Sequence, residues 1–135
     1  MSAKAYLQKI EILDMFIESK RAERDSVWRE AIGVSSALGG DTHASSGVSD
    51  RVGRFALRLS TLDEEITEML KDREERINAI KSLEKPIEVK VLYKRYVEYT
   101  LFTSLQMIAD DMGYSHEHIR EVHSQALRKI QSKIG

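Results

Sequence analysis

Apolar side chains recur every three or four residues along most of this chain, and a single proline, Pro86, interrupts the pattern. Such spacing places the apolar side chains on one face of an α-helix. We therefore expect two long helices before the proline, over residues 3–32 and about 50–83. Glycine is scarce outside residues 39–47, while Glu, Lys, Arg, Ile and Leu are frequent. This composition predicts an all-α fold.

The two long helices are expected to pair as an antiparallel, coiled-coil-like hairpin over about 3–83, because their lengths and apolar spacing are similar. Ser49 or Asp50 is the expected N-cap of the second helix, and Trp28 is expected to pack rather than to stack on bases. A lone pair of helices leaves apolar surface uncovered. We therefore expect residues 1–85 to form a first domain that mediates homodimerisation or a partner contact.

Residues 33–49 connect these helices and include the sequence GGDTHASSG. Asp41, His43 and Ser45 or Ser46 are the residue types of a hydrolase triad, but such a triad needs a scaffold that brings the groups beside oxyanion donors. The segment also lacks the Gly-Lys-Ser/Thr ending of a phosphate-binding loop. We expect a reversal of the chain or a partner-contact tip here, and no enzyme activity.

Composition and charge narrow the classes of function. The chain of 135 residues contains no cysteine, which excludes disulfides and thiolate catalysis. No apolar run approaches the roughly 18 residues of a membrane span, and no signal-peptide core is evident, so we expect a cytoplasmic protein without a membrane partner. Residues 1–85 carry 14 basic and 16 acidic side chains, and residues 86–135 carry 7 and 6. Neither part has the strongly basic balance of many nucleic-acid binders.

The segment after Pro86 contains the pattern of a helix-turn-helix. This motif needs a small residue where its two helices touch and, four residues later, a glycine that can adopt a left-handed backbone; Ala109 and Gly113 meet these needs. Ser104 and Ser115 are the expected N-caps of its two helices. The apolar positions Ile108, Met112, Ile119 and Val122 fit the same register. We therefore predict a helix at 87–98 followed by a helix-turn-helix, in a second domain of residues 86–135.

The second helix of the motif, about 116–130, turns polar side chains outward when Ile119, Val122 and Ala126 face inward. Short or hydrogen-bonding side chains of this kind suit base edges and phosphates, and such a helix fits the major groove. The predicted DNA-binding residues are Ser115, His116, Glu117, Arg120, Glu121, Ser124, Arg128 and Lys129. The spacing of the histidines does not fit a shared metal ion, so we expect neither a metal nor a cofactor.

The segments VLYKRYVEY and IADDMGYSHEHIREVHSQALRKI resemble region 4 of the sigma-70 family, a helix-turn-helix that reads a promoter element. The LYKRY helix, the IA…MGYS turn and the ALRKI tail carry this resemblance. The whole chain is similar to small phage and prophage regulators related to the autolysin regulatory protein and late-gene activator families, in which a helical pair precedes the sigma-like part. The resemblance implies a DNA-binding transcriptional regulator. It also implies six of the DNA-facing positions named above: Ser115, His116, Glu117, Arg120, Glu121 and Ser124.

Two functions follow as expectations from different classes. The first is sequence-specific regulation of transcription through double-stranded DNA. The alternative is a protein-interaction module that docks on RNA polymerase or a sigma factor with little direct DNA binding. The near-neutral charge favours the alternative, and the polar face of the second helix favours the first.

Overall fold

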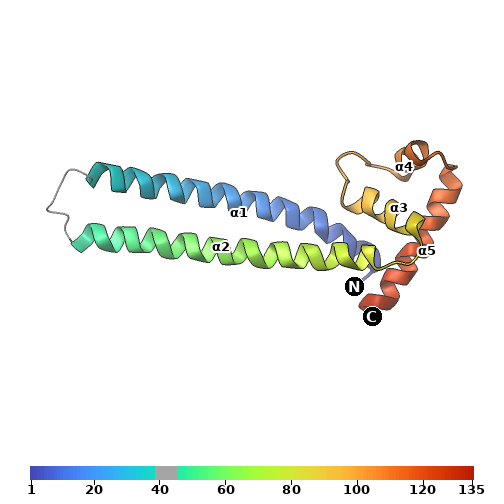
Figure 1. Cartoon of the computed structure of the whole chain (residues 1–135), viewed down its shortest axis with the longest axis horizontal. Helices are drawn as coiled ribbons and strands as arrows, with labels where there is room; N and C mark the ends of the chain where they lie inside the picture. Colours follow the sequence, from blue (N-terminus) through green and yellow to red (C-terminus); the bar gives the residue numbers. More distant parts are fainter. Residues whose placement is uncertain (39–45) are drawn as a thin grey trace. The chain divides into compact units, whose positions relative to one another are not determined.

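The computed structural model describes the backbone of residues 1–38 and 46–135, and the side chains of 1–33 and 50–135. These parts of the chain form five α-helices and no strand (Figure 1), which confirms the all-α prediction. The helices are α1 (Ala3–Leu38), α2 (Ser46–Lys81), α3 (Pro86–Tyr96), α4 (Leu105–Met112) and α5 (His116–Ile134).

Both long helices extend further toward their connection than the sequence pattern indicated. Helix α1 continues through Gly33 to Leu38, and α2 begins at Ser46, so the predicted N-cap positions at Ser49 and Asp50 lie inside α2. A glycine in a helix interior costs only about 1 kcal/mol relative to alanine, which a helix of 36 residues can absorb. Residues 39–45, which include Asp41 and His43, lie outside the described residues. The expectations for this segment therefore stay predictions.

The chain forms two compact units, and the division does not fall at Pro86 where we expected it. One unit comprises Met1–Asp14 and Lys71–Gly135, and the other comprises Met15–Leu70. The reason is that the first turns of α1 and the last turns of α2 bury their apolar residues against the C-terminal helices. Residues 86–135 therefore share a core with parts of both long helices.

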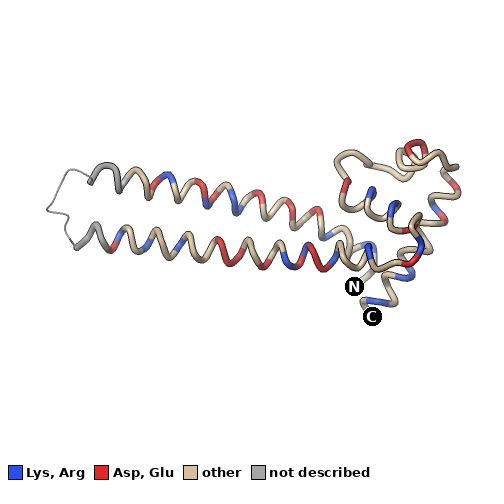
Figure 2. The backbone as a smooth tube through the Cα atoms, in the orientation of Figure 1, with Lys and Arg blue, Asp and Glu red and all other residues tan. Residues whose placement is uncertain are grey.

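The unit of residues 15–70 contains paired stretches of α1 and α2. Its buried apolar residues are Ile17, Val27, Leu62 and Ile66. Ion pairs also join the two helices, and Figure 2 shows charged residues along both of them. The pairs are Lys20–Glu65 at 2.8 Å, Glu23–Arg58 at 3.4 Å and Arg24–Asp63. The paired side chains are partly exposed, so each pair favours the observed alignment of the helices only weakly.

The larger core cluster of the other unit draws on four helices. Its buried members are Ala3, Leu7 and Ile10 of α1, Ile77 and Ile80 of α2 with Leu83 just after it, Leu92 and Tyr96 of α3, and Ala126 and Ile130 of α5. The N-terminus is tied to α5 as well, because the Ala3 amide donates to Gln131 Oε1 at 2.7 Å. The start of the chain is thus held against its last helix.

A second core cluster holds α4 and α5 against α3. Its buried members are Val91 of α3, Ile108 and Ala109 of α4, and Ile119 and Val122 of α5. Pro86 is the first residue of α3, and Lys85 before it is extended with φ −86° and ψ 118°. This is the conformation that a following proline favours, so the break predicted at Pro86 is confirmed.

The contribution of the larger cluster to stability can be tested with two isoleucines of α1. Ile10 is fully buried, whereas Ile12 on the same helix is 48% exposed. Ile10→Ala should lower the free energy of unfolding by about 2–5 kcal/mol, because it removes apolar contacts and leaves a cavity. Ile12→Ala should change it by less than about 1 kcal/mol. Denaturant titrations followed by circular dichroism measure both, and equal losses would contradict the assigned burial.

Candidate nucleic-acid interface

The connection between α4 and α5 turns on one left-handed glycine. Gly113 has φ 75° and ψ 29°, and its amide donates to the Ala109 carbonyl. The next amide, of Tyr114, donates to the same carbonyl at 3.0 Å. A residue with a side chain adopts this backbone at a cost, whereas glycine does not. The turn predicted at Gly113 is therefore confirmed, as is the buried contact at Ala109.

Serines begin both helices of the pair. The Ser104 hydroxyl accepts a hydrogen bond from the Met107 amide at 3.3 Å, and the Ser115 hydroxyl accepts one from the His118 amide at 3.1 Å. Each satisfies an amide of the first turn that has no partner within its helix. The N-caps predicted at Ser104 and Ser115 are both confirmed, and they set where α4 and α5 begin.

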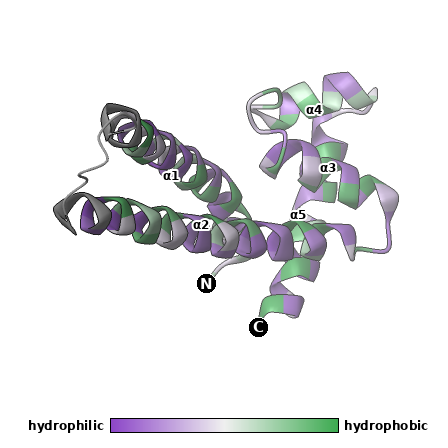
Figure 3. Ribbon diagram, turned by 60° about the vertical axis from the view of Figure 1, so that its left-hand side comes forward, coloured by the Kyte–Doolittle hydropathy of each residue, from purple (hydrophilic) through white to green (hydrophobic). Residues whose placement is uncertain are grey.

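Helix α5 has one buried side and one exposed side. Ile119, Val122, Ala126 and Ile130 are buried, and Figure 3 shows hydrophobic segments of α5 alternating with hydrophilic ones. All eight residues predicted to face DNA are exposed: Ser115, His116, Glu117, Arg120, Glu121, Ser124, Arg128 and Lys129. The structure therefore brings these residues together along one element, with Ser115 as its cap.

Lys129 has a structural partner that the sequence analysis did not identify. Its Nζ lies 2.6 Å from Oε1 of Glu88, whose side chain is only 2% exposed. Removing one member of such a pair leaves a charge buried without its partner, which is strongly destabilising. Lys129 thus neutralises a core carboxylate of α3. The sequence did hold one indication that Glu88 is buried, because its position places it on the same face of α3 as Val91 and Leu92.

The remaining cations of α5 differ from Lys129. Within the described ranges, no ion pair involves Arg120, Arg128 or Lys133. Residues 115–135 carry four basic and two acidic side chains. Because Lys129 is neutralised by Glu88, the charge available to an external anion comes mainly from the other three. This local excess is modest.

His123 is partly buried, and its ring contacts α3. Its Nε2 lies 2.8 Å from the Tyr96 hydroxyl, and the two rings stack with centroids 5.7 Å apart. Burial, with smaller contributions from the positive charges of Arg95 and Lys4, lowers the pKa of His123 to about 4. Burial also raises the pKa of Tyr96 to about 12. Both rings are therefore neutral near pH 7, and His123 is a packing residue.

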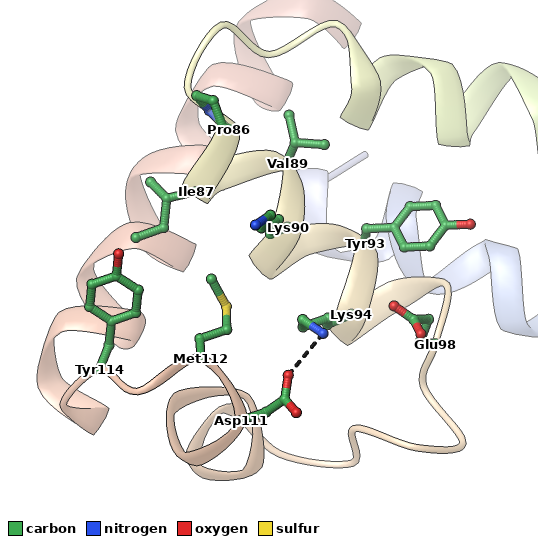
Figure 4. Close-up of a pocket in the computed structure, with 10 residues that line it drawn as sticks. All are labelled: Pro86, Ile87, Val89, Lys90, Tyr93, Lys94, Glu98, Asp111, Met112 and Tyr114. Atoms are coloured by element: carbon green, nitrogen blue, oxygen red, sulfur yellow. Dashed lines mark ion pairs between the residues drawn. The ribbon is translucent and has the colours of Figure 1, made fainter.

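A hollow of about 680 Å³ lies between α3 and α4, beside the turn that follows α4 (Figure 4). Pro86, Ile87 and Val89 line it from α3, while Met112 and Tyr114 line it from the other side. An ion pair of 3.0 Å between Lys94 and Asp111 crosses from α3 to α4. The hollow combines apolar walls with charged groups, as a protein-docking surface does.

Among the described side chains, which are those of residues 1–33 and 50–135, no group of three or more His, Asp or Glu is arranged to hold a metal ion. No described helix combines the length and the apolar character needed to cross a membrane. The chain matches no protein-family model, no curated protein and no solved structure.

The neutral state of His123 predicts how stability depends on pH. Between about pH 6.5 and pH 4, the unfolded chain binds a proton at His123 that the folded chain does not bind. The free energy of unfolding should therefore fall as the pH falls through this window, by about 1 kcal/mol because the ring remains partly exposed. His123→Gln should lose less stability over the same window. Denaturant titrations at pH 7 and pH 4.5 test this, and identical losses for both proteins would contradict it.

Proposed function

We propose that this protein is a non-enzymatic, sequence-specific regulator of transcription that binds double-stranded DNA by placing α5 in the major groove. In this proposal α4, the Gly113 turn and α5 are a helix-turn-helix, and the paired long helices are a hairpin. The observation that carries it is the two-sided character of α5. Apolar residues fix one side in two core clusters, while the other presents a row of exposed polar side chains, as recognition helices do.

The resemblance to sigma region 4 and to small phage regulators indicates which kind of DNA-binding protein we propose. It favours a regulator of phage or prophage type, acting in the cytoplasm. Gly113 and Ser115 belong to the IA…MGYS turn that carries the resemblance, and their turn and cap geometry supports the proposal. The resemblance carries over DNA-facing positions only for Ser115, His116, Glu117, Arg120, Glu121 and Ser124. The phosphate contact that we propose for Arg128 follows instead from its place further along the same helix.

The DNA-facing region carries few positive charges, so a second subunit would raise the affinity for DNA. Phosphate contacts dominate the affinity of proteins for DNA, and few cations are available here. Two linked copies can exceed the affinity of one without any new contact within each site. We therefore propose that the protein acts as a homodimer, in which each subunit presents one α5.

The long helices offer surface for this association. Among the described side chains of residues 15–70, four large apolar residues are buried and seven are exposed. Trp28 and Ile32, one turn apart on α1, are 50% and 45% exposed, so the described side chains cover only about half of Trp28. Neighbouring exposed apolar side chains such as these two are suited to an interaction site.

Trp28 is the only tryptophan of the chain, so its fluorescence reports association directly. Trp28→Glu should lower the mass measured by light scattering toward that of one chain, because a charge opposes burial at the interface. The wild-type emission should shift to longer wavelength on dilution as Trp28 becomes hydrated.

Arg29→Glu is the matched control for this experiment. It adds the same side chain at the next position of α1, outside the apolar pair. A single-chain mass for the wild-type protein at all concentrations would contradict the dimer.

A second function is favoured by one specific observation, the hollow between α3 and α4. In this alternative the protein docks on RNA polymerase or a sigma factor through that surface and binds DNA weakly. Its apolar walls and the near-neutral charge of the chain support it. Polymerase capture by the purified protein, together with the absence of a footprint on any promoter, would favour docking over direct readout.

Direct readout is tested with Arg120, whose exposed guanidinium can bond a base edge bidentately. A duplex is first selected from random sequences with the purified protein. Arg120→Ala should weaken binding to that duplex by about 10-fold to 100-fold and relax its sequence preference, because each such contact is worth roughly 1–3 kcal/mol.

Arg21→Ala is the matched control, because Arg21 is exposed on α1 and far from α5 in sequence. Circular dichroism should give the wild-type spectrum for both variants. Equal binding by wild type and Arg120→Ala, at a fixed salt concentration, would count against the assigned face of α5.

A further inference from the structure

A second hollow, of about 320 Å³, opens beside the first turn of α5. It is distinct from the hollow in Figure 4 and shares no lining residue with it. Its walls come from α1, α3, α4 and α5 and from the residues that precede α4. The side chains that we assign to an anion are Lys4, Arg95 and Ser104. Arg120 and His116 also line the hollow, but they are the residues proposed above to contact bases.

The charge of this second hollow is positive and uncompensated. Its lining includes no Asp or Glu. Within the described part of the chain, no ion pair involves Lys4, Arg95 or Arg120. By contrast, Lys20, Arg24, Arg73 and Lys129 all have carboxylate partners. Three like charges facing one concave site repel one another, and an anion in the site relieves that repulsion.

His123 at the edge of the hollow responds to this field. The positive charges of Arg95 and Lys4 both contribute to lowering its pKa, after the larger contribution of burial. These two cations come from different helices, yet they act on the same ring. Both cations therefore lie close enough to the hollow to act on a ring that lines it.

We propose that this second hollow binds a phosphate group, and that in the DNA complex this is a backbone phosphate next to the bases read by α5. Guanidinium and ammonium groups form charge-assisted hydrogen bonds to phosphate oxygens. The Ser104 hydroxyl, which accepts from the Met107 amide and so keeps its own proton free, supplies a further donor. Helix α4 begins at this hollow, because Ser104 and Leu105 line it, and the first amides of a helix lack partners within it. The DNA part of this proposal rests on the function proposed above.

Lys4 belongs to α1, so the proposed phosphate site extends beyond the helix-turn-helix. It lies in the first turn of α1, and the hydrogen bond from the Ala3 amide to Gln131 Oε1 holds that turn against α5. The burial of Ala3 and Leu7 fixes the same turn from inside. The N-terminal helix therefore contributes to the DNA-binding surface, and the phosphate site is complete only when both ends of the chain are present.

The test compares Lys4→Gln and Arg95→Gln with Lys9→Gln, which alters a lysine of α1 that pairs with Asp72 outside the hollow. Affinity for the selected duplex and for a scrambled duplex is measured over a series of salt concentrations. Lys4→Gln and Arg95→Gln should each weaken both duplexes by a similar factor of about 3–10 and reduce the salt slope by about one. Lys9→Gln should leave both quantities unchanged. Wild-type affinity and slope for both hollow variants would overturn the proposal.

A second measurement separates this proposal from the proposed function. Inorganic phosphate is titrated into the full chain while NMR follows the Arg95 Nε–H signal and the pKa of His123. Bound phosphate should shift that signal and raise the pKa of His123, and Lys4→Gln should weaken both effects. If the protein binds no DNA but phosphate produces these shifts, the hollow is a site for free phosphate and the proposed function fails alone. If phosphate produces no shift and the DNA variants behave as wild type, the hollow is not an anion site.

Discussion

The packing of α5 into two core clusters is the constraint on which the rest of the structure depends. Ile119 and Val122 belong to the cluster with α3 and α4, while Ala126 and Ile130 belong to the cluster with α1 and α2. Because both clusters hold the same helix, its rotation about its own axis is fixed at two levels. Its exposed face is therefore determined by the core, and a recognition surface needs this rigidity.

The buried carboxylate of Glu88 adds a polar constraint to this apolar one. It is 1% exposed, and Lys129 of α5 supplies its partner. A buried ion pair adds little net stability, but it disfavours every arrangement in which one charge lacks its partner. The pair thus specifies how α5 lies on α3. It also means that loss of DNA binding after substitution of Lys129 would report the integrity of α3 and α5 rather than a phosphate contact.

Much of this architecture could be predicted from the sequence, because it depends on local rules. Apolar spacing indicated the helices, Pro86 the break, Gly113 the turn, and Ser104 and Ser115 the caps. The ends of α1 and α2 beside residues 39–45 could not be predicted, since glycine and serine there cost too little to end a long helix. The contacts of Glu88 and Lys4 could not be predicted from the sequence either. Spacing predicts which face of a helix is buried, but not which helix covers it.

This limit explains why the sequence suggested a boundary at Pro86 that the structure does not have. Residues 86–135 contain the whole helix-turn-helix pattern, yet Leu92, Ala126 and Ile130 are covered by residues from the first turns of α1 and the last turns of α2. A fragment without α1 and α2 would expose these side chains to water. The first turns of α1 and the last turns of α2 are thus part of the unit that holds α5 in place.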